Sequence, residues 1–243
     1  MNRLIVLQNI EREGPSLYSI VAGDFGLDTV ISRVFLGESI PTPDNQDVLL
    51  ILGGPMGIDD LENPKFIWLR RELDLINHAL ESDIPIIGVC LGAQLLAYSA
   101  GGNVEPLMDP KSLKPKPEIG WSPIQFNINE IDEKSFQNQD FYTLHWHGDR
   151  ILLPESANLL ASSAKCKEQM FRIGSNAYGL QFHVEVQDMD VQRWIREDVD
   201  FIKLSFGDKA QTILLEQNKE YCNISQLNRL NLIRYIFVQL CGS

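Results

Sequence analysis

The sequence has few basic residues for its size. Of its 243 residues, 21 are Lys or Arg and 33 are Asp or Glu, so the formal net charge is −12. A general nucleic-acid binder needs a surplus of cations to contact phosphates, and so does a polybasic membrane-binding surface. The composition therefore argues against both classes. The 44% of hydrophobic residues is an ordinary globular value and is enough for a large core.

The sequence also has few cysteines and no long hydrophobic run. Its four cysteines lie far apart, and no two of them form a C-x-x-C pair. This spacing argues against a zinc ribbon, a thioredoxin motif and a disulfide framework. The apolar run at residues 4–7 is too short for a signal peptide, and no segment approaches the roughly 18 apolar residues of a transmembrane helix. We therefore expect a cytoplasmic protein with no membrane partner.

Short apolar runs alternate with helical patterns in the N-terminal part of the chain. The runs predict strands over residues 4–7, 29–35, 48–52 and 85–89, and the helical patterns cover 65–80 and 91–99. Strands that alternate with helices are typical of a parallel sheet covered by helices on both faces.

The pattern changes after residue 105. Residues 106–117 are rich in Pro and Lys and predict an exposed loop. Further predicted elements are strands over 121–128 and 141–144, a strand after a loop at 154–161, a strand pair over 168–173 and 177–182, and helices over 189–204, 210–217 and 226–240. We expect an α/β fold with an antiparallel portion. Because no clear linker is present, residues 1–243 are predicted to form one domain, with a core over about 1–190 and a helical C-terminal extension over 191–243.

The segment from Gly88 to Gln94 carries the strongest chemical signal. A buried strand ends at Cys90, a helix follows at once, and Gly88 and Gly92 flank the turn. This is typical of a nucleophile elbow, where a strained turn lifts a catalytic side chain off the sheet. The helix N-terminus favours a thiolate, and the N–H of Leu91 is placed to donate to an oxyanion. The alternative is an inert buried cysteine. We assign that alternative to the other three cysteines, Cys166, Cys222 and Cys241.

A cysteine nucleophile needs a base, and the chain has only four histidines. His183 lies two residues before Glu185 at the end of a predicted strand, so both side chains are on one face. Glu185 would then orient the imidazole and stabilise its protonated form. The predicted catalytic triad is Cys90, His183 and Glu185. The alternative is a structural histidine beside a solvated carboxylate.

His147 is the competing base, because it lies in a dense polar segment with His145, Trp146 and Asp149. Two histidines and an aspartate so close together are also compatible with a metal site. No second cluster of ligands stands out in the sequence, so we predict no metal.

Four segments, in this order along the chain, resemble the motifs of class I glutamine amidotransferases. They are 53–57 (Gly-Gly-Pro-Met-Gly), 88–94 (Gly-Val-Cys-Leu-Gly-Ala-Gln), 145–149 (His-Trp-His-Gly-Asp) and 179–185 (Gly-Leu-Gln-Phe-His-Val-Glu). The third resembles the form found in GMP synthetases. The family usually has Pro where this chain has Val184, and Pro fixes the backbone without supplying chemistry.

The resemblance implies a flavodoxin-like fold with a mostly parallel central sheet flanked by helices. It implies that an N–H of Gly54 completes the oxyanion hole with that of Leu91. It also implies that Gln94, one helical turn after the nucleophile, binds the substrate. The resemblance also implies that three further residues, His145, Trp146 and His147, form a wall of the substrate pocket.

The implied reaction is hydrolysis of the side-chain amide of glutamine through a γ-glutamyl thioester, with the ammonia passed to a synthetase. The chain after Glu185 is too short for a synthetase domain, and no phosphate-binding loop is present. We therefore predict no cofactor and an ammonia acceptor in a separate subunit. The alternatives are a stand-alone hydrolase of another γ-glutamyl compound, a non-catalytic regulatory subunit, and a redox-sensing cysteine protein of a related fold.

Overall fold

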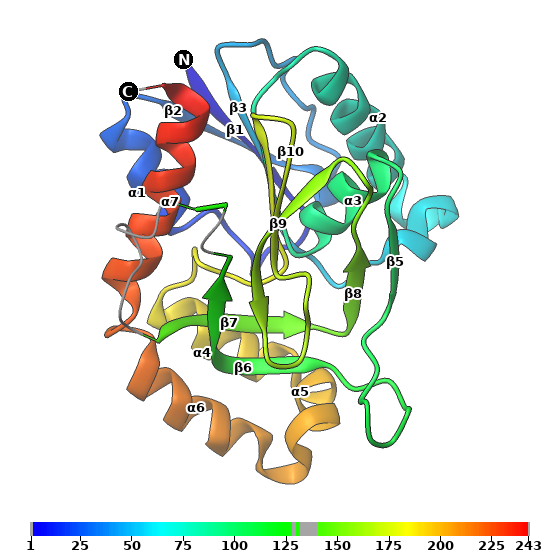
Figure 1. Ribbon diagram of the computed structural model, residues 1–243, viewed down its shortest axis with the longest axis vertical. Coiled ribbons are helices and arrows are strands. Elements are labelled where there is room, and N and C mark those ends of the chain that lie inside the picture. The colour runs from blue at the N-terminus through cyan, green and yellow to red at the C-terminus, as the bar shows by residue number, and fades with distance from the viewer. Residues whose placement is uncertain (1, 128–129, 132–139, 243) are drawn as a thin grey trace.

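The computed structural model describes residues 2–127, 130–131 and 140–242, and a nine-stranded mixed sheet forms its centre (Figure 1). The strand order is β2-β1-β3-β4-β11-β10-β9-β6-β7. The parallel part contains β1 (Arg3–Gln8), β2 (Asp28–Arg33), β3 (Val48–Ile51), β4 (Ile86–Val89) and β11 (Ala177–Leu180). The antiparallel part contains β6 (Glu118–Phe126), β7 (Phe141–His147), β9 (Ala157–Ser163) and β10 (Met170–Ile173).

The apolar strands of the parallel part are buried on both faces. In β1, Leu4 and Val6 face one hydrophobic cluster, and Ile5 and Leu7 face the other, because successive side chains of a strand point to opposite faces. The order β2-β1-β3-β4-β11 is the flavodoxin-like order, and its switch point lies between β1 and β3. Ligands bind at the carboxyl ends of such strands. The predicted α/β fold with a parallel core is therefore confirmed.

Helices cover both faces of this parallel part. The first cluster contains side chains of α1 (Leu17–Asp24) and α7 (Gln226–Cys241), and the second contains those of α2 (Trp68–Glu81) and α3 (Leu91–Ser99). Figure 1 shows the pair α1 and α7 on one side of the sheet and the pair α2 and α3 on the other.

The antiparallel part carries its own helical layer. Near β6 and β7 lie α4 (Asp188–Glu197), α5 (Val199–Phe206) and α6 (Ala210–Tyr221), whose apolar side chains share a third cluster with Trp121 and Leu144 (Figure 1). A separate two-stranded sheet pairs β5 (Asn103–Pro106) with β8 (Asp149–Leu152). Short 3-10 helices span Val34–Leu36, Ile58–Glu62, Pro64–Phe66 and Gly207–Lys209.

Several elements differ from the sequence prediction. The predicted strand over 29–35 ends at Arg33, because the next residues form a 3-10 helix. The predicted helix over 189–204 divides at Asp198 into α4 and α5. Helix α1 and strands β5 and β8 were not predicted. In α1 the buried residues and the exposed Ile20 are all apolar. Its sequence therefore does not show the spacing of polar and apolar residues that reveals an amphipathic helix. Residue 128, at the end of another predicted strand, lies outside the described residues.

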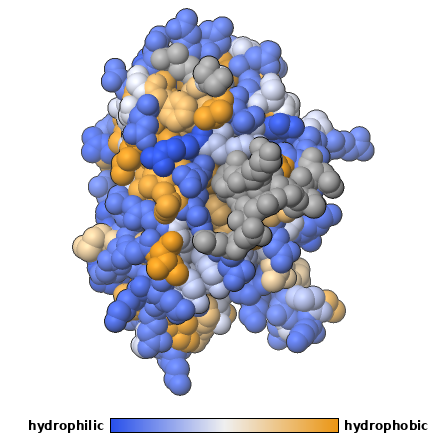
Figure 2. Space-filling view, turned by 60° about the vertical axis from the view of Figure 1, so that its left-hand side comes forward, coloured by the Kyte–Doolittle hydropathy of each residue, from blue (hydrophilic) through white to orange (hydrophobic). Residues whose placement is uncertain are grey.

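Among the described residues, no helix is long and apolar enough to span a membrane. Figure 2 shows the side of the molecule on which α1 and α7 lie. Hydrophilic residues dominate this face, and hydrophobic residues form separate patches between them.

Candidate active site

Cys90 lies at the turn between β4 and α3. Its backbone has φ 51° and ψ −105°, a conformation that costs a non-glycine residue on the order of 1–3 kcal/mol. A Cβ on Gly88 would collide with the carbonyl of Gly92, and a Cβ on Gly92 would collide with the carbonyl of Ile51. Both glycines therefore allow α3 to approach the sheet closely, which fixes the strained turn at Cys90.

His183 and Glu185 follow the end of β11, next to Cys90. His183 Nδ1 lies 2.7 Å from Glu185 Oε1, and both side chains are buried. The backbone N–H of His183 donates to the carbonyl of Leu144 at 2.8 Å, which fixes it against β7. Its ring also packs edge-on against Trp194. The structure thus places the three predicted triad residues together.

The electrostatics of this group favour a protonated imidazole. Burial lowers the pKa of His183, but the Glu185 carboxylate and hydrogen bonds to Cys90 and Glu185 outweigh it. The pKa of His183 therefore lies well above its usual value of 6.5. A cationic imidazole next to a sulfur atom stabilises the thiolate form of that sulfur.

Two glutamines and one carbonyl surround the sulfur atom. Gln181 Nε2 lies 3.6 Å from Cys90 Sγ, and Gln94 Nε2 donates to Gln181 Oε1 at 3.3 Å. The backbone oxygen of Trp146 lies 4.0 Å from Cys90 Sγ. The Gln181 amide is a donor that can stabilise a thiolate, and sequence reasoning did not assign it a role.

The two predicted oxyanion donors are neighbours in space. A Cβ on Gly54 would lie 3.4 Å from Cδ2 of Leu91, and Gly54 lines the cavity next to Cys90. Leu91 is the first residue of α3, where backbone N–H groups have no intrahelical acceptor. Gly54 and Leu91 therefore lie beside each other, and Leu91 directly follows Cys90.

The cavity at Cys90 has a volume of about 190 Å³. It is lined by five of the predicted site residues, Gly54, Cys90, Gln94, Trp146 and His147. It lies at the carboxyl ends of the parallel strands, where the flavodoxin-like order predicts a ligand site.

His145 does not line this cavity. It is fully buried two positions before the end of β7, where Nε2 lies 3.3 Å from the carbonyl of Ser122 and 3.2 Å from Thr143 Oγ1. Burial lowers its pKa to about 4, although the Glu118 carboxylate opposes this. The predicted wall therefore consists of Trp146 and His147, with a neutral His145 behind it.

Sequence reasoning missed three charged side chains at the cavity, Arg12, Glu13 and Asp198. Arg12 Nη2 pairs with Asp198 Oδ2 at 3.0 Å, and Arg12 Nε lies 3.6 Å from Glu13 Oε1. Burial raises the pKa of Glu13, and the nearby His183 and Arg12 oppose this rise. Glu13 lies in the loop after β1, at the carboxyl end of a parallel strand, so the position of ligand sites in this fold is a signal that could have indicated it. Asp198 lies between two helices, where no sequence pattern indicated a site.

Comparisons with known proteins agree with one another on the family. Residues 25–198 match a family model described as glutamine amidotransferase class-I. The glutamine amidotransferase-like protein YfeJ of Salmonella typhimurium is 32% identical over 177 residues, which cover 71% of each chain. A glutamine-hydrolyzing GMP synthase of Lactobacillus delbrueckii is 30% identical over 169 residues, which cover 62% of this chain but only 31% of that enzyme.

The same agreement extends to a solved structure. The crystal structure of a glutamine amidotransferase from Thermotoga maritima superposes with a TM-score of 0.80 at 27% sequence identity. The superposition covers 99% of this chain and 98% of that one, including the helical C-terminus.

Proposed function

The chain belongs to the class-I glutamine amidotransferase family, and we propose that it hydrolyses the side-chain amide of glutamine. One observation carries this proposal. Cys90 is held at a positive φ at the N-terminus of α3, and beside it lies His183, whose Nδ1 is 2.7 Å from Glu185 Oε1. A strained cysteine paired with an oriented imidazole suits nucleophilic attack on an amide.

In the proposed first step, Cys90 Sγ attacks the amide carbon while His183 holds the thiol proton. The carbonyl oxygen becomes an oxyanion, and the N–H groups of Gly54 and Leu91 stabilise it by roughly 3 kcal/mol per donor. The carbon–nitrogen bond then breaks, and His183 gives the proton to the departing nitrogen. Ammonia leaves, and the glutamyl group remains on sulfur as a thioester.

In the proposed second step, water attacks the thioester carbon. His183 accepts a proton from this water and returns it to the sulfur when the carbon–sulfur bond breaks. Glutamate is released and Cys90 is restored. Glu185 keeps its charge throughout, and its carboxylate orients the imidazole and stabilises the imidazolium.

The size of the cavity favours a small substrate. Its volume of about 190 Å³ lies below the roughly 300–1,000 Å³ of sites for drug-sized ligands. A single amino acid such as glutamine suits this volume better than a peptide, whose remaining residues would extend beyond the cavity.

The charges at the cavity support a second candidate substrate. Three acidic residues, Glu13, Asp149 and Asp198, line it, and among the described lining residues Arg12 is the one Lys or Arg. The α-ammonium group of a glutamyl substrate needs only one carboxylate partner. The remaining carboxylates of the cavity are compatible with a second positively charged group on the substrate. The second candidate is therefore a γ-glutamyl amide whose leaving amine is positively charged. A panel of such amides, compared with glutamine by kcat/KM, distinguishes the two.

We also propose that the ammonia passes to a separate synthetase. The chain aligns with only 31% of a complete glutamine-hydrolyzing GMP synthase, so most of that enzyme has no counterpart in the match. Such a partner would raise glutaminase activity on docking. Co-purification of this chain with a synthetase from its own organism, followed by an ammonia assay, tests the proposal.

The first prediction concerns the nucleophile. We expect Cys90→Ala to lower ammonia release from glutamine by at least about 10³-fold, because no other group forms the thioester. The matched control is Cys241→Ala, in the last turn of α7, which should keep full activity. Equal ammonia release by Cys90→Ala and the unaltered chain would contradict the proposal.

A labelling experiment covers the case in which activity requires the partner. A glutamine analogue with a chloromethyl ketone in place of the amide should alkylate Cys90, and free glutamine should protect it. Peptide mass analysis identifies the labelled cysteine. Labelling that is equal at Cys166 or Cys222, or that glutamine does not reduce, argues against a glutamine site.

A further inference from the structure

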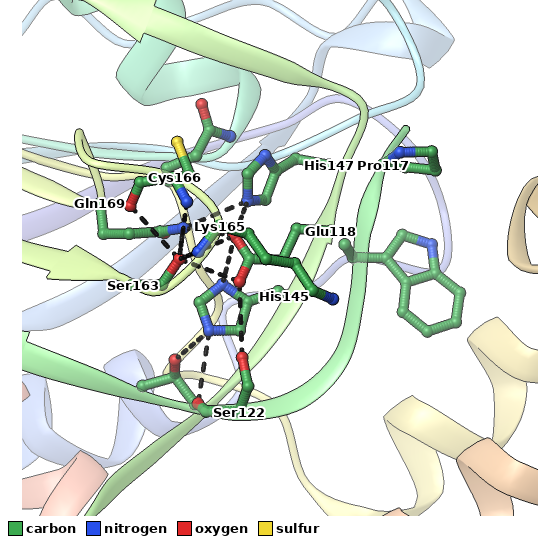
Figure 3. A network of polar contacts seen from close by, with 12 residues as sticks. Pro117, Glu118, Ser122, His145, His147, Ser163, Lys165, Cys166 and Gln169 are labelled. Atoms are coloured by element: carbon green, nitrogen blue, oxygen red, sulfur yellow. Dashed lines mark hydrogen bonds and ion pairs between the residues drawn. The ribbon is translucent and has the colours of Figure 1, made fainter. Parts of the chain in front are cut away.

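A buried cluster of metal-ligating side chains lies directly behind the cavity wall. Glu118 on β6 and His145 and His147 on β7 each place one ligating atom within 4.8 Å of the other two. All three are almost fully buried, as is the neighbouring Gln169. Figure 3 shows both imidazoles and the Gln169 amide directed at the Glu118 carboxylate.

The hydrogen bonds of His145 determine which of its nitrogens is free. Nε2 lies 3.3 Å from the carbonyl of Ser122, and a carbonyl only accepts, so the ring proton of neutral His145 is on Nε2. Nδ1 then carries a lone pair. It has no hydrogen-bond partner among the described residues, and it faces Glu118 Oε2 at 3.7 Å. Two acceptors therefore face each other in a dry interior. Gln169 Nε2 and Ser163 Oγ donate to Glu118 Oε2, but His145 Nδ1 stays unsatisfied, which is unfavourable without a cation beside it.

His147 is arranged in the same way. Its Nδ1 lies 2.8 Å from the carbonyl of Asp149, so Nδ1 is the donor. Its Nε2 lies 3.4 Å from the same oxygen, Glu118 Oε2. Metal-binding histidines in proteins usually donate their second ring N–H to a carbonyl or carboxylate in this manner. Both imidazoles are thus oriented by backbone carbonyls toward one point beside the carboxylate.

We propose that Glu118, His145 and His147 bind a divalent transition-metal ion of the zinc type. Two imidazoles and one carboxylate are a donor set that suits zinc. Zinc bonds of about 2.0–2.1 Å in a tetrahedron place neighbouring ligand atoms about 3.3–3.4 Å apart. The separations of 3.4 and 3.7 Å from Glu118 Oε2 are close to this value. The two imidazole nitrogens lie within 4.8 Å of each other, so binding requires side-chain rotations that bring them closer together.

Gln169 supplies a candidate fourth ligand. Its Oε1 is buried without a hydrogen-bond partner in the described part of the chain, while Nε2 lies 2.8 Å from Glu118 Oε2 and 3.4 Å from His147 Nε2. A half-turn of the amide exchanges its oxygen and nitrogen, and this brings the oxygen to the metal.

The sequence prediction of no metal considered a different carboxylate, Asp149. The antiparallel register of β6 and β7 instead pairs Glu118 with His147, which sequence spacing does not reveal. A metal bound here would join β6, β7 and the segment before β10. It would thereby fix the cavity-lining His147 and the Trp146 carbonyl beside Cys90.

The test is metal binding by the full chain, purified without chelators, stripped and then titrated with Zn²⁺ alone. We expect about one tightly held zinc per chain and a rise in Tm of roughly 8 °C or more at saturating metal. Substituted Co²⁺ should give the visible absorption of a tetrahedral site. Glu118→Gln and His145→Gln should weaken zinc binding by at least about 100-fold. The control His78→Gln removes an exposed histidine on α2 and should bind like the unaltered chain.

The opposite results are equally clear. If the stripped, unaltered chain takes up no zinc and its Tm does not change, the proposal is wrong. Zinc uptake that is equal in Glu118→Gln also contradicts it. If either variant fails to fold, as judged by circular dichroism, the Co²⁺ spectrum and the Tm shift of the unaltered chain still decide.

Discussion

At the scale of single residues, the site depends on charges that have little contact with water. His183 is 1% exposed and Glu185 is 2% exposed. Glu185 Oε2 has no hydrogen-bond partner among the residues described. Little water screens the attraction between this carboxylate and the imidazole, so it is much stronger than at a surface. This explains why the pKa of His183 is raised although its burial acts in the opposite direction.

The second prediction follows from this pair. In Glu185→Gln, kcat/KM should fall by roughly 10²–10⁴-fold, because the imidazolium loses its stabilising charge. Burial then dominates, the pKa of His183 falls, and the alkaline limb of the pH–rate profile moves to lower pH. The control Glu197→Gln changes an exposed carboxylate on α4. A profile in Glu185→Gln identical to that of the unaltered chain would show that Glu185 does not act on His183.

The same pair affects stability with a definite sign. The folded-state pKa of His183 lies above its usual value of 6.5, so protonation stabilises the fold fully below about pH 6.5. This stabilisation is lost as the pH rises through the folded-state pKa. The difference in free energy of unfolding between the unaltered chain and Glu185→Gln should therefore decrease at alkaline pH, as measured by urea unfolding.

The third prediction concerns Glu72, a fully buried residue of α2 outside the site. Burial raises its pKa from 4.5 to about 8. The protonated carboxyl therefore contributes its full stability below about pH 4.5, and this contribution to the free energy of unfolding is lost as the pH rises through about 8. Glu72→Gln removes this titration. The free energy of unfolding of the variant, relative to that of the unaltered chain, should rise by roughly 3 kcal/mol or more between pH 4.5 and pH 9. The exposed Glu81→Gln on the same helix should show no such trend in urea unfolding.

At the scale of elements, the site is a junction of strand ends with one helix. Strands β1, β3, β4 and β11 end at the same edge of the sheet, where Glu13, Cys90 and His183 meet around Gly53. Helix α3 must lie very close to β4 for this, and residues 88 and 92 lack side chains at the contact. The position of the nucleophile is therefore set by backbone packing more than by its own side chain.

The fourth prediction tests this packing. In Gly88→Ala, the new Cβ would lie 2.5 Å from the Gly92 carbonyl oxygen, which is backbone and cannot turn away. We expect a loss of about 3 kcal/mol in stability, with a loss of activity as α3 shifts. The control is Gly23→Ala in α1, where nothing lies within 4 Å of the new Cβ and a gain of up to about 1 kcal/mol is expected. Unchanged Tm and activity in Gly88→Ala would contradict the argument.

At the scale of the whole molecule, the C-terminal helix supports the catalytic strand. Arg229 of α7 is fully buried, and its Nη1 donates to the carbonyls of Val184 and Val186, which flank Glu185. The guanidinium also lies over the ring of Trp121. We propose that residues 1–243 fold as one unit in which the extension over 191–243 completes the core.

The fifth prediction tests that long-range contact. Arg229→Met leaves two buried carbonyls without a donor, which should cost about 2–4 kcal/mol in urea unfolding. Glu185 should lose its fixed position, so kcat should fall more than KM rises. The control Arg234→Met removes a partly exposed arginine of the same helix, which pairs only with the half-exposed Asp24 among the described residues. If Arg229→Met keeps the kcat of the unaltered chain, α7 does not position the triad.

The sequence by itself determined the local features. Apolar runs fixed most strands, because burial on both faces leaves no polar residue in them, and Gly88, Cys90 and Gly92 predicted the elbow from three neighbouring positions. The family also followed from four local motifs, and the family comparison confirms it. The roles of the individual site residues stay predictions. Tertiary structure alone decided which distant groups meet: Glu13 with His183, Glu118 with His147, and Arg229 with the backbone carbonyls on either side of Glu185. These contacts depend on strand order, register and helix docking, which no local pattern encodes.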